Sequence, residues 1–218
     1  MKQLHMKPHH APGLLLTFCG LDGCGKTTMI RRLADDLQKD GYGICLTKQP
    51  TDAVRGSGIF RTYMDQPDHE RYEYRSLSLL AAGDRVQHVS KVILPELAQG
   101  KIVLCDRYFY SCLANLRARG YTEDRWIYEI GGCLIRPDVS FFFDIPVEMA
   151  VGRVRARPEE RDRYIDMALQ YRLAREYREI CRVNGGVSVP TDIPLEETYR
   201  LVKEKVTERL GKQNEKQA

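Results

Sequence analysis

The chain alternates between short apolar stretches and longer stretches in which apolar residues recur every three or four positions. Five of the short stretches predict β-strands, at residues 14–19, 44–48 (extended by Gly43), 101–105, 139–144 and 187–189. Most of them are continuous apolar runs rather than alternating ones, as expected of strands that are covered on both faces. The pattern therefore predicts a parallel sheet that is buried on both sides.

The longer stretches predict amphipathic helices. In residues 76–97 an apolar stripe recurs at helical spacing, through Ala82, Val86, Val89, Ile93 and Leu97. Pro95 is expected to kink or end that helix, because proline lacks the N–H that an interior turn needs. Residues 163–184 carry a second stripe, formed by Met167, Tyr171, Ala174, Tyr177 and Cys181, and leave for solvent Arg172, Arg175, Arg178 and Arg182. Strands separated by helices indicate an α/β fold, a parallel five-stranded sheet wound by helices on both faces.

Composition places the chain among ordinary globular proteins. Its 218 residues, 43% of them hydrophobic and 29% charged, suffice for one domain with a sizeable core. The formal net charge of +4 suits polyanionic small molecules and falls short of the basic signature of a nucleic-acid binder. We expect a single domain over residues 13–210, with loose polar tails at residues 1–12 and 211–218. For the tail histidines we favour a frayed segment over weak metal binding; they are His5, His9 and His10.

Cysteine usage and the lack of membrane segments indicate a cytoplasmic protein. The seven cysteines are scattered without C-x-x-C spacing, and an odd number in a chain of this length favours reduced thiols over a disulfide framework. The N-terminus lacks the apolar region of a signal peptide, and no apolar run approaches the 18 residues of a membrane span. Cys24 has two interpretations, a reactive thiol and a small apolar filler, of which we favour the second.

The stretch GLDGCGKT, residues 20–27, fits the phosphate-binding pattern G-x-x-x-x-G-K-[ST] between a predicted strand and a predicted helix. Its glycines bring backbone N–H groups close to phosphate oxygens, and the N-terminus of a helix that starts near Lys26 faces the same oxygens. Lys26 supplies a positive charge for the β- and γ-phosphates, and Thr27 supplies a hydroxyl for Mg²⁺. The predicted nucleotide-binding residues here are Gly20, Asp22, Gly23, Cys24, Gly25, Lys26, Thr27 and Thr28.

A carboxylate ends another predicted strand. Asp106 follows the apolar run IVLC, and in P-loop proteins a carboxylate at such a position holds Mg²⁺ or its water. Arg107 beside it has two interpretations, a bidentate phosphate contact and a surface ion pair. A GTPase is not indicated, because the chain has no N-K-x-D motif, and P-loop machines of the AAA and helicase types usually need longer chains.

Arginines concentrate in residues 153–163. They are Arg153, Arg155, Arg157, Arg161 and Arg163. Arg153 and Arg157 are four residues apart and are expected on one helical face. We interpret the segment as a lid that closes over phosphates, as a small-molecule kinase requires. The alternative is a solvated helix end paired with Glu159 and Glu160.

Taken together, these motifs resemble the thymidylate kinases, a family of P-loop nucleoside monophosphate kinases, over roughly residues 14–205. The matching stretches are GLDGCGKTT (20–28), AAGDRVQH (81–88), DRYFYSCLA (106–114) and the run RPDVSFFFDIPVEMAVGRVRAR that leads to the lid. The resemblance implies an ATP- and Mg²⁺-dependent phosphotransferase that acts on dTMP and forms homodimers. Since the phosphate loop contains no arginine, it also implies that the catalytic arginines lie on the lid, where we expect Arg157 and Arg161.

The resemblance implies further roles, carried over position by position. Asp22 would contact the acceptor sugar, Asp106 would act near Mg²⁺ and the acceptor phosphate, and Arg107 would bind that phosphate. Arg153 would lie near the adenine of ATP, and Arg85 would approach the acceptor base. The remaining acceptor-site positions are Lys48, Pro50, Ala81, Ser111 and Asn115.

The acceptor side departs from the family pattern at four places. Ala81 stands where the family has a phenylalanine that packs on thymine, and the family motifs A-Y-Q, R-E-P and G-G-T become Ala114-Asn115-Leu116, Lys48-Gln49-Pro50 and Thr51-Asp52-Ala53. The acceptor therefore stays open between dTMP, another nucleoside monophosphate, and a phosphate- or phosphonate-bearing metabolite. A nucleotide-binding regulator without turnover is a further alternative, which the intact donor residues disfavour. We expect the aromatic residues Tyr121, Trp126 and Tyr128 in the core or at a dimer contact rather than in the acceptor site.

Overall fold

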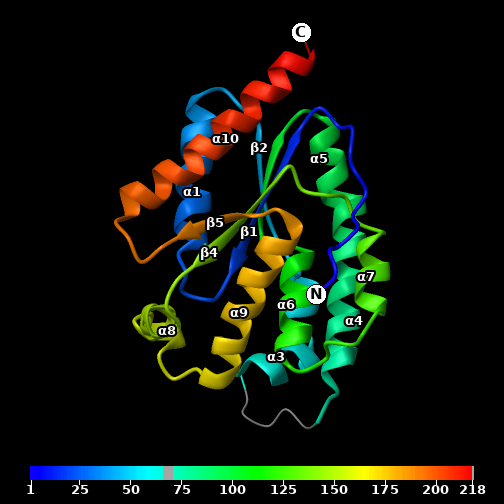
Figure 1. Cartoon of the computed structure of the whole chain (residues 1–218), viewed down its shortest axis with the longest axis vertical. Helices are drawn as coiled ribbons and strands as arrows, with labels where there is room; N and C mark the ends of the chain where they lie inside the picture. Colours follow the sequence, from blue (N-terminus) through cyan, green and yellow to red (C-terminus); the bar gives the residue numbers. More distant parts are fainter. Residues whose placement is uncertain (66–70, 218) are drawn as a thin grey trace.

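The computed structural model describes residues 1–65 and 71–217 and is built around a five-stranded, all-parallel sheet (Figure 1). The strands follow the order β2-β3-β1-β4-β5 across the sheet. They are β1 (Leu14–Gly20), β2 (Ile44–Lys48), β3 (Ile102–Asp106), β4 (Val139–Asp144) and β5 (Val187–Pro190). All seven residues of the central strand β1 are buried, which explains its unbroken apolar run. The five strand predictions and the parallel sheet are confirmed, each strand to within one residue at either end.

Helices cover both faces of the sheet, as predicted (Figure 1). On one face pack α1 (Lys26–Lys39) and α10 (Leu195–Gln217). On the other face pack α5 (Leu94–Ala98), α6 (Phe109–Ala118) and α9 (Met167–Asn184), with α4 (Tyr74–His88) against α6. The shorter helices are α2 (Asp52–Arg55), α3 (Gly58–Asp65), α7 (Trp126–Gly131) and α8 (Val147–Arg155). The carboxyl ends of β1 and β3 open toward α4, α6 and α9, and this opening positions the site described below.

The predicted helix over residues 76–97 is observed as three consecutive parts. A π-helical turn, Val89–Ile93, separates α4 from α5. Of the two expected effects of Pro95, an end of the helix is not observed, because Pro95 falls in the first turn of α5, where its missing N–H is tolerated after the wider π-helical turn. The predicted apolar stripe is confirmed, since Ala82, Val89, Ile93 and Leu97 are buried and Val86 is partly buried.

Helix α9 is shorter than predicted and buries most of the predicted stripe. It starts after Asp166, whose side chain accepts a hydrogen bond from the Leu169 N–H (2.9 Å) and so caps the helix. The stripe is confirmed for the buried Ala174, Tyr177 and Cys181 and the partly buried Met167, whereas Tyr171 is 50% exposed. Leu169 and Leu173 are buried in addition. The exposure of the four arginines is confirmed for Arg172, Arg175, Arg178 and Arg182.

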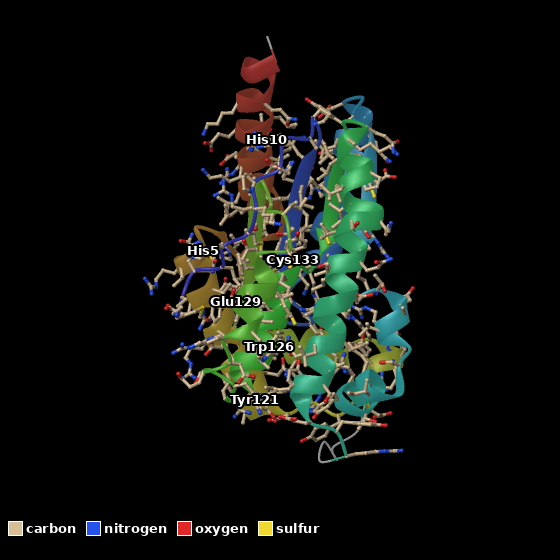
Figure 2. The ribbon with its side chains drawn as sticks, turned by 90° about the vertical axis from the view of Figure 1, so that its right-hand side faces the viewer. His5, His10, Tyr121, Trp126, Glu129 and Cys133 are labelled. Atoms are coloured by element: carbon tan, nitrogen blue, oxygen red, sulfur yellow. The ribbon has the colours of Figure 1, made fainter. Side chains whose placement is uncertain are left out.

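The N-terminal segment is packed against the domain, which differs from the loose tail expected over residues 1–12. Leu4 and Met6 are buried, and Lys7 forms a parallel bridge with Ile135 through two backbone hydrogen bonds of 2.9 and 2.7 Å. Figure 2 shows this segment on the same face as α7, where His5 and Cys133 are labelled. The His9 ring contacts the Asp138 carboxylate at 2.8 Å. Within the described ranges, no group of three or more histidine, cysteine or acidic residues has the arrangement of a metal site.

The C-terminal segment also differs from the expectation of a loose tail over residues 211–218. Helix α10 continues to Gln217, and residue 218 lies outside the described residues. An i,i+4 ion pair between Lys212 and Glu208 (2.6 Å) supports its last turns. Among the helices of residues 1–65 and 71–217, none has the length and apolarity required to cross a membrane.

Candidate active site

The phosphate-binding loop lies between β1 and α1, as the motif predicted. Gly25 precedes the first residue of α1 with φ +92°, a conformation that glycine adopts without strain. Gly23 has φ +81°, and a Cβ there would lie 2.1 Å from the Ala150 carbonyl oxygen of α8. Only glycine fits at this position, because α8 packs directly against the loop. The free N–H groups at the start of α1 are then available to bind an anion.

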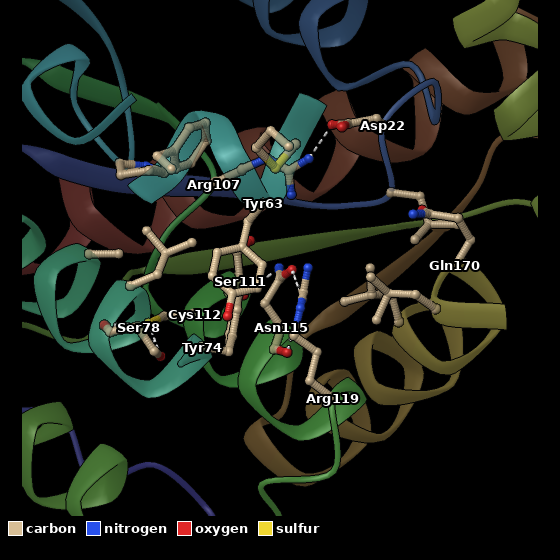
Figure 3. A pocket seen from close by; sticks show the side chains of 18 of the residues that line it. Asp22, Tyr63, Tyr74, Ser78, Arg107, Ser111, Cys112, Asn115, Arg119 and Gln170 are labelled. Carbon is tan, nitrogen blue, oxygen red and sulfur yellow. Dashed lines mark hydrogen bonds and ion pairs between the residues drawn. The ribbon is translucent and has the colours of Figure 1, made fainter. Parts of the chain in front are cut away.

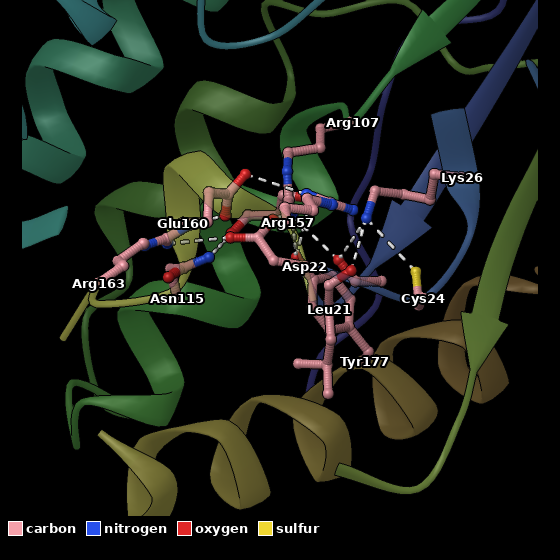
Figure 4. A network of polar contacts seen from close by, with 12 residues as sticks. Leu21, Asp22, Cys24, Lys26, Arg107, Asn115, Arg157, Glu160, Arg163 and Tyr177 are labelled. Atoms are coloured by element: carbon pink, nitrogen blue, oxygen red, sulfur yellow. Dashed lines mark hydrogen bonds and ion pairs between the residues drawn. The ribbon is translucent and has the colours of Figure 1, made fainter. Parts of the chain in front are cut away.

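Lys26 is buried beneath this loop. Its Nζ donates hydrogen bonds to the carbonyl oxygens of Gly20 (3.2 Å) and Leu21 (2.6 Å) and lies 3.4 Å from the Cys24 Sγ (Figure 4). Cys24 is fully buried, which confirms the interpretation as a small filler. The next two residues, Thr27 and Thr28, are exposed at the start of α1.

The end of β3 brings two predicted residues against the loop. The Asp106 Oδ1 is buried and has no hydrogen-bond partner among the described residues. Arg107 has φ +68°, a strained conformation for a residue other than glycine, and such strain concentrates at functional sites. Its guanidinium donates to the Gly20 carbonyl oxygen (3.0 Å), the Tyr177 hydroxyl (3.0 Å) and the Asp22 carboxylate (2.5 Å) (Figure 4). The three contacts fix the guanidinium beside the phosphate loop.

Nearby charges keep Asp22 ionised, and burial keeps the Tyr177 hydroxyl protonated. Burial alone would raise the pKa of Asp22, but the charges of Arg107, Lys26 and Arg163 outweigh it and hold that pKa well below its usual range. Burial raises the pKa of Tyr177 to about 12, so its hydroxyl stays protonated and donates to the Ser111 Oγ (3.1 Å). Asp22 therefore remains a carboxylate that draws guanidinium groups toward the loop.

The lid arginine that approaches the phosphate loop is not one of the two that were expected to do so, Arg157 and Arg161. Helix α8 ends at Arg155, and Arg157 is extended (φ −84°, ψ 124°), because the following Pro158 disfavours helical geometry there. The prediction that Arg153 and Arg157 share one helical face is therefore wrong. Arg163 reaches the loop and pairs with Asp22 at 3.1 Å.

The remaining lid arginines have other partners. Arg157 pairs with Glu160 (3.0 Å), which agrees with the alternative of a helix end paired with glutamates. Arg161 is exposed, and Arg153 donates to the Thr191 carbonyl oxygen (2.9 Å) after β5. The spacing of the arginines in the sequence did not distinguish Arg163 from its neighbours.

A pocket that is partly open to solvent lies beside the loop and between α3, α4, α6 and α9 (Figure 3). Its lining includes Gly20 of the phosphate loop and all but one of the predicted acceptor-site residues, namely Asp22, Pro50, Ala81, Arg85, Arg107, Ser111 and Asn115. Lys48 does not line the pocket: it is exposed at the end of β2, whereas the chain turns inward at Pro50. Arg55 of α2, which the sequence analysis missed, lines the pocket and donates to the Pro50 carbonyl oxygen (2.9 Å).

The motif around Arg85 holds one wall of the pocket in place. Asp84 accepts hydrogen bonds from the Thr51 N–H (2.8 Å) and hydroxyl (2.5 Å), and the His88 ring contacts the Thr47 hydroxyl at 2.7 Å. These contacts fasten the segment after β2 to α4. Arg85 itself is buried, donates one hydrogen bond to the Ala81 carbonyl oxygen (2.8 Å) and leaves its Nε without a partner.

Aromatic residues reach the pocket from positions that the sequence analysis did not single out. Phe60 and Tyr63 line it from α3, and Tyr74 lines it from the start of α4. The aromatic residues after the D-R-Y motif are partly buried against the core and do not line the pocket, as expected of Tyr121, Trp126 and Tyr128 (Figure 2).

The charge of the pocket wall indicates an anionic ligand. Five guanidinium groups line it, from Arg55, Arg85, Arg107, Arg119 and Arg163, whereas the carboxylates in the lining are those of Asp22 and Asp166. Burial and the nearby charge of Arg107 lower the pKa of Arg55. Like charges crowded in this way are stabilised by a ligand that carries negative charge.

The part of the chain that matches known proteins includes the phosphate loop, the pocket and the lid. The sequence matches the family model described as thymidylate kinase over residues 18–202. It is 38% identical over 186 residues to a probable thymidylate kinase of Pyrococcus abyssi and 37% identical over 186 residues to one of Pyrococcus horikoshii; each alignment covers 81% of this chain and 90% of the relative. It is 30% identical over 208 residues to the thymidylate kinase of onion yellows phytoplasma, covering 89% of this chain and 97% of that protein.

Proposed function

The chain belongs to the thymidylate kinase family, and from that premise we propose that it transfers the γ-phosphoryl group of ATP to dTMP, giving ADP and dTDP. One observation carries the proposal: the phosphate loop and a pocket rich in guanidinium groups share the wall formed by Gly20, Asp22 and Arg107. A phosphate held in the pocket therefore lies next to a phosphate held by the loop. Phosphoryl transfer requires mainly this positioning, together with positive charge around the transferred group.

On the donor side, the loop N–H groups and Lys26 bind the phosphates of ATP, and the Lys26 amine exchanges its loop carbonyl acceptors for phosphate oxygens. Arg153, held against the segment after β5, would lie near the adenine, as the resemblance implies. Asp106 and Thr27 fit a Mg²⁺ site, because the Asp106 Oδ1 is buried without a partner and Thr27 is exposed at the start of α1. The metal ion would neutralise charge on the phosphates.

On the acceptor side, Arg107 binds the phosphate of dTMP with a guanidinium that three protein contacts already orient. Asp22 lies beside it and contacts the sugar. Arg85 and Ser111 line the pocket farther along α4 and α6 and face the base. Because these donors are fixed before the ligand arrives, little ordering is lost on binding.

The lid supplies the remaining positive charge. Arg163 is already in place through Asp22 and Glu160, and the resemblance assigns Arg157 and Arg161 to the phosphates once the lid closes. Closure also excludes water, which would otherwise compete as the phosphoryl acceptor.

A homodimer fits the outer surface of α4 and α5. Leu79 and Leu80 are 49% and 44% exposed there, and Leu94 follows on α5. A second copy of the chain would bury these side chains. The seven cysteines are unpaired, which supports a place in the reducing cytoplasm.

The test is an assay of ADP release with purified protein, Mg²⁺-ATP and a panel of acceptors: dTMP, dUMP, UMP, CMP, AMP and GMP. Wild type should turn over dTMP most efficiently and release little ADP without an acceptor. The variant Lys26→Ala, which removes the loop charge, serves as the inactive control. Preferred turnover of another nucleotide, or no turnover with any of the six, would overturn the assignment to dTMP.

A further inference from the structure

Tyr177 is a buried tyrosine of α9 whose hydroxyl contacts the guanidinium assigned to the acceptor phosphate. The residue is 5% exposed, and Figure 4 shows it in the polar network that contains Arg107 and Asp22. Its hydroxyl accepts a hydrogen bond from Arg107 (3.0 Å) and donates one to the Ser111 Oγ (3.1 Å). Because the single proton of the hydroxyl is directed to Ser111, the oxygen lone pairs are left for the guanidinium.

The contacts of Arg107 leave two of its donors open. A guanidinium carries five N–H groups. One terminal nitrogen donates to the Gly20 carbonyl oxygen (3.0 Å) and to the Tyr177 hydroxyl, and the other donates once, to the Asp22 carboxylate (2.5 Å). Within residues 1–65 and 71–217, the Nε–H and the last terminal N–H have no partner. Donors on adjacent nitrogens of a guanidinium bind two oxygens of one phosphate.

Two of the three partners of Arg107 are shared with other cations. The Gly20 carbonyl oxygen also accepts a hydrogen bond from the Lys26 Nζ (3.2 Å), and the Asp22 carboxylate also pairs with Arg163 of the lid (3.1 Å). Both contacts therefore change when ATP occupies the loop or when the lid moves. In the described part of the chain, the Tyr177 hydroxyl accepts from Arg107 alone. It is the constraint on the guanidinium that the reaction cycle leaves in place.

The position of Tyr177 is itself fixed, because α9 is fastened to α6. The Arg172 Nε donates to the Ala118 carbonyl oxygen (2.7 Å). One residue before Tyr177, the buried Glu176 pairs with Arg117 at 2.8 Å. The hydroxyl is thus presented by a pair of packed helices, whereas the other two partners of the guanidinium belong to the phosphate loop.

We propose that Tyr177 is a positioning residue that keeps the two open N–H groups of Arg107 directed at the acceptor phosphate while the nucleotide and the lid engage the other partners of that guanidinium. The proposal rests on the proposed function, because it assumes that Arg107 binds a phosphate of the acceptor. The Tyr177 proton is occupied by Ser111, so the hydroxyl acts on the ligand through Arg107. Its loss should therefore weaken recognition of the phosphate and leave recognition of the nucleoside intact.

The experiment measures the affinities of dTMP and of thymidine, which lacks the phosphate, for wild type, Tyr177→Phe, Arg107→Gln and the double variant. Tyr177→Phe keeps the ring, and should weaken dTMP binding about tenfold while thymidine binding and the KM for ATP stay within about twofold. In the Arg107→Gln background the same substitution should have no further effect on dTMP, because no guanidinium is left to position. Tyr171→Phe is the matched control and should equal wild type, since Tyr171 lies on the same helix, is 50% exposed and does not line the pocket.

Three results would overturn the proposal while leaving the proposed function intact: an unchanged dTMP affinity in Tyr177→Phe, equal losses for dTMP and thymidine, or a full additional loss in the Arg107→Gln background. The last two, with a lower melting temperature, are the signature of a merely structural tyrosine. If wild type neither binds nor phosphorylates dTMP, the proposed function fails. The guanidinium N–H signals of Arg107 in NMR spectra, assigned by their loss in Arg107→Gln, then still decide the inference. They should exchange with water faster in Tyr177→Phe than in wild type, and equal rates would overturn it.

Discussion

The structure distinguishes among the lid arginines, and this leads to a quantitative prediction for Arg163→Gln. Arg163 pairs with Asp22 (3.1 Å) and Glu160 (3.0 Å), its side chain is 24% exposed, and its buried Nε has no partner. Among the described residues of the lid, Arg163 is the one whose guanidinium contacts the phosphate loop. We therefore expect it to supply charge to the transferred phosphoryl group, with its free Nε–H as an additional donor.

Two magnitudes separate a catalytic loss from a loss of stability. Each of the two ion pairs is partly exposed, and such pairs contribute about 0.2–1 kcal/mol, so the substitution should lower the free energy of unfolding by about 1 kcal/mol. Loss of a preorganised donor to a transition-state charge costs about 3–4 kcal/mol, which corresponds to a decrease in kcat of about 10²–10³-fold. The catalytic effect should therefore exceed the structural one.

The assay is ADP release at saturating ATP and dTMP, with urea denaturation of the same preparations. Arg155→Gln is the control, because Arg155 is exposed at the end of α8 and forms no ion pair within the described part of the chain. Arg157→Gln and Arg161→Gln should reduce kcat less than Arg163→Gln. The reasoning fails if Arg163→Gln keeps kcat within threefold of wild type, or if either of the other two lid variants loses more.

Three further predictions concern the loop, the pocket wall and the N-terminal segment. Gly23→Ala would place a methyl group 2.1 Å from the Ala150 carbonyl oxygen at positive φ, and should abolish the ATP binding that calorimetry detects in wild type. Burial lowers the pKa of His88, so the neutral ring stabilises the fold, and this contribution is complete above pH 6.5. The urea midpoint of wild type should therefore fall as the pH drops from 7 to 5, and the midpoint of His88→Gln should fall by less. Asp138→Asn removes a 9% exposed carboxylate that contacts His9 and Arg209, and should lower the free energy of unfolding by about 3 kcal/mol in urea titrations; an unchanged midpoint would mean that these ion pairs contribute no stability.

The sequence was sufficient for the sheet and the phosphate loop because both depend on local patterns. A strand covered on both faces must be apolar at successive positions, so β1 and β3 are recognisable without knowledge of their neighbours. The loop requires glycine at fixed offsets before Lys26, and a motif of this kind specifies its own backbone. The proximity of Asp22, Arg107 and Ser111 in one site followed from the order of the motifs along a parallel sheet.

The remaining features depend on contacts between distant segments. The N-terminal segment packs because Leu4 meets Gly131 of α7 and Lys7 pairs with Ile135, and neither partner is visible in a polar, histidine-rich stretch. In the lid, Pro158 predicts an extended Arg157, and this local constraint overrides the helical spacing between Arg153 and Arg157. The inward orientation of Arg163 depends on Asp22, more than a hundred residues away, and no local pattern encodes it.

The departures from the family's acceptor motifs suggested a loss of aromatic contact and positive charge, but the pocket retains both. Ala81 removes a ring from the pocket wall, yet Tyr74, two helical turns earlier on α4, and Tyr63 on α3 bring rings to the same pocket. Lys48 does not line the pocket, yet Arg55 lines it a few residues later. A pocket selects its ligand by the groups on its surface rather than by the sequence positions that supply them. The departures therefore argue for a rearranged dTMP site, in which aromatic contact and positive charge come from α2, α3 and the start of α4.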